Sequence, residues 1–312
     1  MSKNKIKQDI RKLIIGLFLI VGIYIYTTFL EEPINSILDK YTVVTDTPDI
    51  VNRVVEGNLK VYFLDVGQAD SIMIENKDHY MLIDAGNNAD GRKLVSFFQS
   101  KNIKNFDIVV GTHAHEDHIG GMDEIINNFS IKKFYMPDVI TTTRTFEDVI
   151  LALEDSNVAF DTPKVGGSFN LGDAVFKVIY VGTNEEDLNS TSIVLKMNYG
   201  STSFLFTGDA TSDVERQILT KDIAVDVLKV GHHGSKYSST IDFLKRVNPK
   251  YAVIQVGKEN DYGHPNRETL SNLANIGAKV YRTDKSGTIV ASTDGKEILF
   301  TTMETDLDGN RQ

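Results

Sequence analysis

The chain has 312 residues, of which 41 % are hydrophobic and 24 % charged. This composition is typical of a globular protein with a substantial core and excludes a disordered chain. Cysteine is absent, which excludes disulfides and thiolate metal sites, so any metal must be held by histidine and carboxylate. The formal net charge of −10 disfavours a broad nucleic-acid-binding surface, because phosphate contacts need lysine and arginine.

The N-terminal region is predicted to hold a membrane anchor. Residues 13–30 carry no charge; basic side chains precede them, and Glu31 and Glu32 follow. About 20 apolar residues span a bilayer as a helix, and the positive-inside rule places residues 1–12 in the cytoplasm and the remainder outside the cell. We therefore expect a single-pass protein of the cell membrane. A cleaved signal peptide, which would make the protein secreted, is disfavoured because no A-x-A-like site follows the apolar run. A buried core helix would keep a polar face and is also disfavoured.

Residues 31–58 are polar and irregular and predict a linker, whereas residues 59–301 predict one folded domain, followed by a tail at 302–312. Strands are predicted at Lys60–Leu64, Ser71–Glu75, His79–Ala85, Asp107–Gly111, Lys133–Met136, Ala174–Val181, Ser192–Tyr199, Ser203–Thr207, Val225–Val230 and Tyr251–Val256. Helices are predicted at Arg92–Lys101, Asp123–Phe129, Phe146–Leu153, Ser212–Leu219, Thr240–Val247 and Arg267–Ile276. A final hairpin is predicted over Lys279–Thr301, turning at Asp294 and Gly295. Paired strands with interleaved helices predict the α/β (α+β) class, with mixed sheets covered by helices.

The strongest chemical pattern is T-H-A-H-E-D-H-I-G-G at residues 112–121. A predicted strand leads into it, and two glycines release it into a helix. His113 and His115 are two residues apart, so they face the same side of an extended segment. Asp117 and His118 follow where the chain turns and can face a second centre. Neutral imidazole and carboxylate oxygen are natural ligands of zinc or manganese, so the pattern predicts a divalent metal site rather than a polar loop.

This pattern resembles the H-x-H-x-D-H hallmark of the metallo-β-lactamase superfamily. Five further segments, in matching order, resemble the hydrolase domain of the ComEC/Rec2 competence proteins. They are D-V-G-Q-A-D at Asp65–Asp70, L-I-D-A-G at Leu82–Gly86, F-T-G-D-A at Phe206–Ala210, K-V-G-H-H-G-S at Lys229–Ser235 and Y-G-H-P at Tyr262–Pro265. The resemblance covers about residues 59–300. It implies a four-layer αββα sandwich with the metals at one edge, between the sheets.

The resemblance also assigns roles to the matching positions. The metal ligands that it implies are His113, His115, Asp117, His118, Asp209, His232 and His233. The catalytic roles that it implies belong to Asp84, Asp117, His233 and His264. Asp209 matches a carboxylate that bridges two metals, and Asp117 and His118 match the second site. His232 matches the late ligand of that site, but the sequence leaves open whether His232 or His233 ligates. One or two zinc or manganese ions are expected per chain.

The first metal site departs from the superfamily pattern. His113 and His115 match two of its ligands, but no histidine lies between His118 and His232 to complete it. The matching stretch is Asn189–Ser192. The first site is therefore expected to be weak, completed by water, or empty, and an enzyme with one metal stays an alternative.

Four other polar residues have two interpretations each. Asp84 matches an acid that orients a ligand histidine or the metal-bound water. His264 is expected to contact a substrate phosphate or to donate a proton, and its alternative is a loop histidine satisfied by the backbone. Gln68 and Asp70 either support the site or form a polar turn. His79 is expected at the surface.

These residues predict hydrolysis by metal-activated hydroxide, because a bound metal lowers the pKa of water and the G-x-S-x-G motif of serine hydrolases is absent. We expect a membrane-anchored extracellular phosphodiesterase or nuclease, with a phosphodiester substrate that includes DNA. The first alternative is a hydrolase of cell-envelope phosphodiesters such as phosphorylcholine or teichoic acid. A non-catalytic binding module is less favoured, and a true β-lactamase is disfavoured. ComEC proteins also carry a multi-helix channel, whereas this chain has one apolar span. The sequence does not reveal which proteins the chain binds.

Overall fold

The computed structural model describes residues 59–183 and 186–303. The predicted anchor at 13–30, the linker before residue 59 and the tail after residue 303 lie outside this part. Within it, no helix combines the length and the apolar character needed to cross a membrane. All described residues belong to one compact unit, Val44–Gln312.

The first sheet has eight strands in the order β17-β16-β1-β2-β3-β5-β7-β8. Its strands are β1 (Leu59–Phe63), β2 (Ile72–Asn76), β3 (His79–Ile83), β5 (Ile108–Val110), β7 (Phe134–Tyr135), β8 (Phe160–Asp161), β16 (Ile289–Thr293) and β17 (Ile298–Thr302). Strands β17 to β3 pair antiparallel, and β3, β5, β7 and β8 pair parallel. The parallel half brings the carboxyl ends of β3 and β5 to one edge.

The second sheet has seven strands in the order β15-β14-β13-β12-β11-β10-β9. Its strands are β9 (Ser168–Leu171), β10 (Ala174–Tyr180), β11 (Val194–Tyr199), β12 (Thr202–Phe206), β13 (Val227–Lys229), β14 (Tyr251–Ile254) and β15 (Lys279–Arg282). Strands β9 to β12 pair antiparallel, and β12 to β15 pair parallel. The carboxyl ends of β12, β13 and β14 therefore also lie at one edge.

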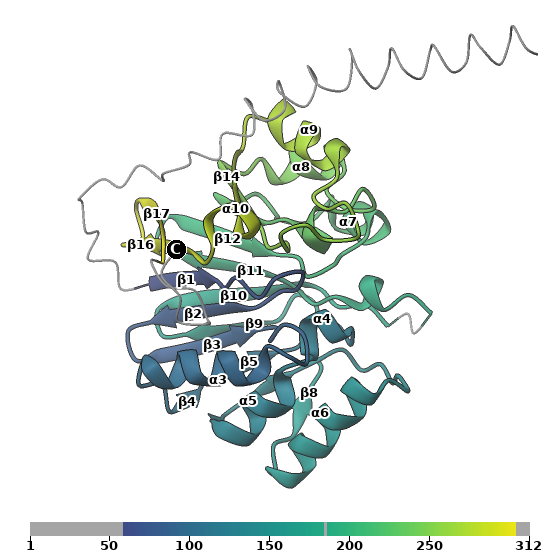
Figure 1. Cartoon of the computed structure of the whole chain (residues 1–312). Coiled ribbons are helices and arrows are strands. Elements are labelled where there is room, and N and C mark those ends of the chain that lie inside the picture. Colours follow the sequence, from purple (N-terminus) through teal and green to yellow (C-terminus); the bar gives the residue numbers. More distant parts are fainter. Residues whose placement is uncertain (1–58, 184–185, 304–312) are drawn as a thin grey trace, which may run out of the picture. The chain divides into compact units, whose positions relative to one another are not determined.

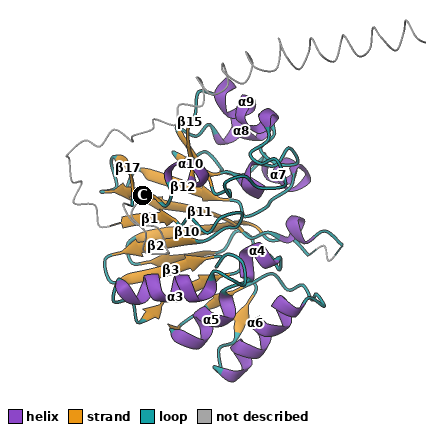
Figure 2. Cartoon of the chain, in the orientation of Figure 1, coloured by secondary structure: helices purple, strands orange, loops and turns teal. Residues whose placement is uncertain are grey.

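Helices cover the outer face of each sheet (Figures 1 and 2). The helices of the first half are α3 (Gly91–Ser100), α4 (Glu116–Ile119), α5 (Met122–Asn128) and α6 (Arg144–Asp155). Those of the second half are α7 (Ser212–Ile218), α8 (Ile241–Val247), α9 (Arg267–Asn275) and α10 (Thr283–Ser286), with the 3-10 helices η2 (Leu188–Thr191) and η3 (Gly231–Gly234). A small parallel pair, β4 (Asn105–Phe106) and β6 (Ser130–Ile131), lies apart from both sheets. The predicted four-layer αββα architecture is confirmed.

Alternation along the strands builds three apolar layers. In β1, Val61 and Phe63 pack between the two sheets, while Tyr62 packs on the opposite side beneath the first helices. In β12, Phe206 faces the layer between the sheets and Leu205 faces the second group of helices. Successive side chains of a strand point to opposite faces, so both sheets are buried on both sides.

The predicted hairpin over Lys279–Thr301 is wrong in its first half. Only β16 and β17 form a hairpin, turning at Asp294 and Gly295 as predicted. Strand β15 instead pairs parallel with β14 in the other sheet. The chain between β15 and β16 crosses from one sheet to the other through α10.

Candidate metal centre

The predicted site residues follow the carboxyl ends of strands from both sheets. Asp84 comes directly after β3, and the 112–121 segment follows β5. Asp209 comes three residues after β12, and η3 follows β13. Because parallel strands end at the same edge, residues far apart in sequence meet there. The two halves of the fold thus each contribute side chains to one site.

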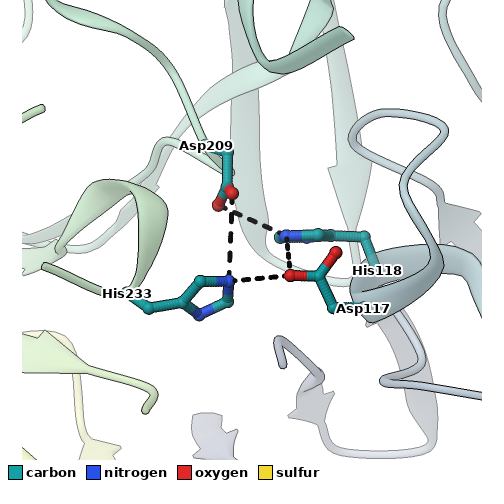
Figure 3. A group of neighbouring side chains, drawn as sticks. All are labelled: Asp117, His118, Asp209 and His233. Atoms are coloured by element: carbon teal, nitrogen blue, oxygen red, sulfur yellow. Dashed lines mark hydrogen bonds and ion pairs between the residues drawn. The ribbon is translucent and has the colours of Figure 1, made fainter. Parts of the chain in front are cut away.

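Four of these side chains form a tight cluster (Figure 3). Asp117, His118, Asp209 and His233 each offer one ligand atom, and these atoms lie within 4.8 Å of one another. His118 Nε2 lies 3.3 Å from Asp209 Oδ1, and His233 Nε2 lies 3.2 Å from Asp117 Oδ2. The cluster contains two imidazoles and two carboxylates, which is the donor set that zinc and manganese accept in proteins.

Unpartnered polar atoms within the cluster fit a metal. His118 Nε2 and Asp209 Oδ1 are buried and have no hydrogen-bond partner among the described residues. Buried polar atoms are normally hydrogen-bonded, and leaving one unpaired costs about 1–3 kcal/mol. Two such atoms that face each other across 3.3 Å are explained if both ligate one divalent ion. The residues present therefore fit a bound metal.

Asp84 lies behind His118 and fixes its orientation. Its Oδ2 accepts hydrogen bonds from Thr112 Oγ1 and His118 Nδ1, both in the range 2.7–2.8 Å, and its Oδ1 accepts from Thr112 N at 2.7 Å. A proton on His118 Nδ1 leaves Nε2 free to ligate, which is the usual arrangement of a carboxylate behind a metal-bound histidine. Asp84 itself adopts a φ of 60°, a conformation rare for a residue with a Cβ. Of the two predicted roles of Asp84, the structure places it where it orients a ligand histidine.

The adjacent histidines of η3 point to different surroundings. Both adopt a φ of 51°, which turns the backbone sharply. His233 is buried, and its Nδ1 lies 3.0 Å from the carbonyl oxygen of Gln255, so Nε2 faces the cluster. His232 is partly exposed, and its Nε2 lies 3.6 Å from Asp209 Oδ2. His233 is therefore the histidine that joins Asp117, although sequence matching favoured its neighbour.

His113 and His115 lie beside this cluster as a second group. His113 Nε2 and His115 Nδ1 are 3.0 Å apart, and the His113 ring centroid lies 4.1 Å from that of His118. At the place of the missing third histidine, Ser192 Oγ lies 3.5 Å from His113 Nδ1. Asn189 lines the adjoining cavity, and its Oδ1 is buried without a hydrogen-bond partner among the described residues. The second group thus offers two imidazoles and one amide oxygen, a weaker ligand set.

The charges of the cluster favour a cation. Burial raises the pKa of Asp209, but the rings of His118 and His233 outweigh burial and hold that pKa well below its usual range. Burial lowers the pKa of both histidines, but Asp209 and neighbouring carboxylates raise it, well above the ordinary value for His118 and to about 10 for His233. The cluster therefore holds ionised carboxylates and stabilises positive charge. A divalent ion can replace the protons that supply this charge.

A buried ion pair supports His233 from behind. Lys229 Nζ lies 2.6 Å from Asp70 Oδ2, and both side chains are at most 1 % exposed. Asp70 Oδ1 lies 3.3 Å from His233 Nδ1. Burial raises the pKa of Asp70, but Lys229, His233 and His118 together outweigh burial and lower it. Of its two predicted interpretations, Asp70 thus has the supporting one. Lys229 was placed in a predicted strand and in the Lys229–Ser235 segment, but no role was predicted for it. A lysine at an inward position of a buried strand was the available signal.

A cavity of about 510 Å³ opens onto the cluster. Among its lining residues, His115, Asp117, Asp209, His232 and His233 belong to the two groups described above, and His264 lies at its mouth. Burial and His232 lower the pKa of His264 to about 4, so its imidazole is neutral near pH 7 and can donate a hydrogen bond. His79 is exposed, as predicted, and pairs with Asp107.

Sequence comparisons agree with this geometry. The model of the metallo-beta-lactamase superfamily matches residues 64–258. ComE operon protein 3 of Bacillus subtilis (strain 168) is 32 % identical over 251 residues, which cover 74 % of this chain and 32 % of that protein. Competence protein ComA of Neisseria gonorrhoeae is 28 % identical over 242 residues, which cover 76 % of this chain and 32 % of that protein. The chain spans about a third of the length of these curated relatives.

Solved structures show the same fold. Igni18, a metallo hydrolase of Ignicoccus hospitalis, matches with a TM-score of 0.51 and 19 % identity, over 74 % of this chain and 98 % of that one. YhfI of Bacillus subtilis, a metallo-beta-lactamase fold protein, matches with a TM-score of 0.51 and 14 % identity over the same shares. The curated relatives named above and Recombination protein 2 of Haemophilus influenzae, which is 28 % identical over 72 % of this chain and 28 % of that protein, confirm the resemblance to competence proteins. The chain belongs to the metallo-β-lactamase superfamily, and this membership supports a metal-dependent hydrolase.

Proposed function

We propose that this chain is a metal-dependent phosphodiesterase that cleaves nucleic acid outside the cell. The observation that carries the proposal is the cluster of Asp117, His118, Asp209 and His233 at the base of an open cavity. Curated relatives named as competence and recombination proteins support nucleic acid as the substrate. The acidic net charge of −10 restricts binding to a local stretch of strand rather than a long track.

The protein's own residues have defined tasks in this reaction. A divalent ion held by the cluster lowers the pKa of water and stabilises negative charge on the attacked phosphate. Asp84 keeps His118 in the ligating orientation, and the carbonyl of Gln255 does the same for His233. His264, neutral at the mouth, donates a hydrogen bond to a phosphate oxygen and holds the substrate. Zinc and manganese are the ions that this donor set favours.

We test the activity with the purified full chain in detergent and added zinc or manganese. Cleavage of single- or double-stranded DNA is expected, with a loss of well over 100-fold in Asp209→Ala, because removing a ligand exceeds the 10–100-fold effect of outer partners. The matched control is Asp213→Ala, an exposed carboxylate paired with Arg216 on α7, which is expected to retain activity.

The substrate panel separates the alternatives. Hydrolysis of bis-(p-nitrophenyl) phosphate or of a phosphorylcholine chromophore, without cleavage of DNA, would establish the envelope phosphodiesterase instead. A chain that hydrolyses none of these with either metal, and binds a partner equally well after His113→Ala, would establish a binding module and refute the proposed reaction.

We further propose that residues 13–30 anchor the chain in the cell membrane with the hydrolase domain outside. Their lack of charge and the basic residues before them support this orientation. Because the chain has no cysteine, single cysteines report their side of the membrane cleanly. A membrane-impermeant maleimide applied to intact cells is expected to label Lys296→Cys and to spare Ser2→Cys. The reverse pattern, or loss of the protein into the medium, would refute the anchor.

A further inference from the structure

A second hollow adjoins the cavity of the metal centre. Its volume is about 680 Å³, and its walls come from the loop after β1, the loop after β14 and the α10 region. Gln68 lines both this hollow and the metal cavity. The two spaces therefore adjoin each other at Gln68.

A hydrogen bond to the backbone holds the side chain of Gln68 between the two spaces. Gln68 Oε1 accepts a hydrogen bond from Gly257 N at 3.0 Å, which leaves the side-chain NH₂ of Gln68 without a described partner. Asn260, on the far side of the hollow, donates to the carbonyls of Gly257 and His264 at 3.0 and 2.7 Å. The loop that forms the hollow is thus the loop that positions His264 at the metal cavity.

Two lysines that form no ion pair with a described residue line the hollow. Lys258 and Lys285 line it, are exposed, and form no ion pair with any residue in the described part of the chain. Of the acids in its wall, Asp284 is held by Arg282 through two contacts of 2.6 and 2.9 Å. Asp65 accepts a hydrogen bond from Gly67 N. In a strongly acidic protein, two unpaired lysines in one hollow beside the reaction centre favour an anionic ligand.

We propose that this hollow is a phosphate subsite, in which Gln68, Lys258 and Lys285 bind the backbone of a nucleic acid strand next to the phosphate at the metal centre. The inference rests on the proposed function and adds where the strand next to the cleaved phosphate binds. Tyr262 favours a nucleic acid over other polyphosphodiesters. Its ring is 73 % exposed, lines the metal cavity and stacks on His264 with centroids 5.8 Å apart, and exposed aromatic rings accept stacked bases.

Binding, measured without catalysis, tests the subsite. We use the full chain in detergent with metals removed by chelation, and a fluorescent single-stranded oligonucleotide in an anisotropy titration. The variant Lys258→Gln/Lys285→Gln is expected to raise Kd about tenfold. It should also lower the slope of log K against log salt by roughly 1.4, at about 0.7 per lost phosphate contact on a single strand. The control Lys245→Gln/Lys296→Gln makes the same charge change on exposed lysines elsewhere.

The outcomes separate the subsite from the reaction. Equal effects of the two double variants would overturn the subsite. Displacement of the oligonucleotide by poly(glycerol phosphate) as effective as displacement by unlabelled oligonucleotide would overturn the assignment to nucleic acid. Lysine-dependent binding by a wild-type chain that hydrolyses no phosphodiester would support the subsite while refuting the proposed reaction.

Discussion

At the residue scale, the two adjacent histidines of η3 show how a backbone turn divides similar side chains between roles. In a regular strand, neighbours point to opposite faces. Here both His232 and His233 have a φ of 51°, which costs on the order of 1–3 kcal/mol for such strained conformations. The gain is that the Nε2 of His233 reaches Asp117 while the ring of His232 lies 5.9 Å from that of His264 at the cavity mouth.

This division predicts different metal contents for two single variants. His233→Ala is expected to lose the ion of the main cluster, because it removes one of four ligands. His232→Ala is expected to keep that ion, because its one close carboxylate contact among residues 59–183 and 186–303 is with Asp209 at 3.6 Å. Metal analysis by mass spectrometry after dialysis checks both. Equal loss in the two variants would contradict the assignment of the ligand to His233.

The buried pair of Lys229 and Asp70 predicts a large coupling energy. Lys229→Met leaves the Asp70 carboxylate buried without its partner, and is expected to lower the free energy of unfolding by about 3–5 kcal/mol. Adding Asp70→Asn removes that charge and is expected to recover most of the loss. A urea titration followed by far-ultraviolet circular dichroism suits this chain, which has no tryptophan. Additive losses in the double variant would show that the two side chains do not stabilise each other.

At the scale of elements, one buried carboxylate joins α7 to the start of α8. Glu215 on α7 accepts hydrogen bonds from the backbone N–H groups of Ser239 and Thr240 and from the hydroxyl of Thr240. Burial raises the pKa of Glu215 from 4.5 to about 7. The folded chain therefore takes up a proton that the unfolded chain releases between these values, so this contribution to stability falls as pH rises from about 4.5 to 7.

The expected result is a pH-dependent difference between two chains. The free energy of unfolding of wild type, relative to Glu215→Gln, is expected to be higher at pH 5 than at pH 8 by up to about 3 kcal/mol, at 1.36 kcal/mol per pKa unit. Because both chains keep the metal cluster, the titration of its histidines cancels in the comparison. A difference that grows with pH would show that the pKa of Glu215 is lowered.

The glycine pair after α4 fixes how the ligand segment packs. A Cβ on Gly120 would lie 2.2 Å from the backbone nitrogen of Asn88, and one on Gly121 would lie 2.5 Å from the carbonyl oxygen of Ala85. Both obstacles are backbone atoms, which move only with the loop after β3. Gly120→Ala is therefore expected to destabilise the chain by more than about 2 kcal/mol. Gly166→Ala separates crowding from backbone strain, because its Cβ would meet nothing within 4 Å while its φ of 83° is strained for alanine. Urea unfolding is expected to show a larger loss in Gly120→Ala than in Gly166→Ala.

At the scale of the whole molecule, local patterns predicted the elements better than their partners. Apolar patterns identified most strands of both sheets, but missed the short edge strands β8 and β9. The 112–121 motif indicated Asp117 and His118 of the cluster. Both signals lie in neighbouring residues. The pairing of β15 with β14 was missed. The predicted hairpin joined β15 to β16, which is close in sequence, whereas packing places β15 beside β14. The ion pair of Lys229 was missed because its partner, Asp70, lies in the other half of the chain. Distant contacts such as these require the folded structure.

The four residues of the cluster come from both halves of the chain. Asp117 and His118 follow strands of the first sheet, whereas Asp209 and His233 follow strands of the second, so an ion bound by all four ties the two halves together. An ion at about 100 times its Kd stabilises the folded chain by about 2.7 kcal/mol. Chelation is therefore expected to lower Tm by on the order of 5 °C or more for a domain of this size.

Thermal unfolding of the full chain, with and without chelator, measures this effect. Adding zinc back is expected to restore Tm in wild type and in Asp213→Ala, whose exposed side chain pairs with Arg216. Asp209→Ala is expected to show no shift with either treatment, because it lacks the carboxylate nearest to the Nε2 atoms of His118 and His232. If Asp209→Ala responds to chelation as strongly as wild type does, the stabilising ion lies elsewhere, and the cluster does not join the two sheets.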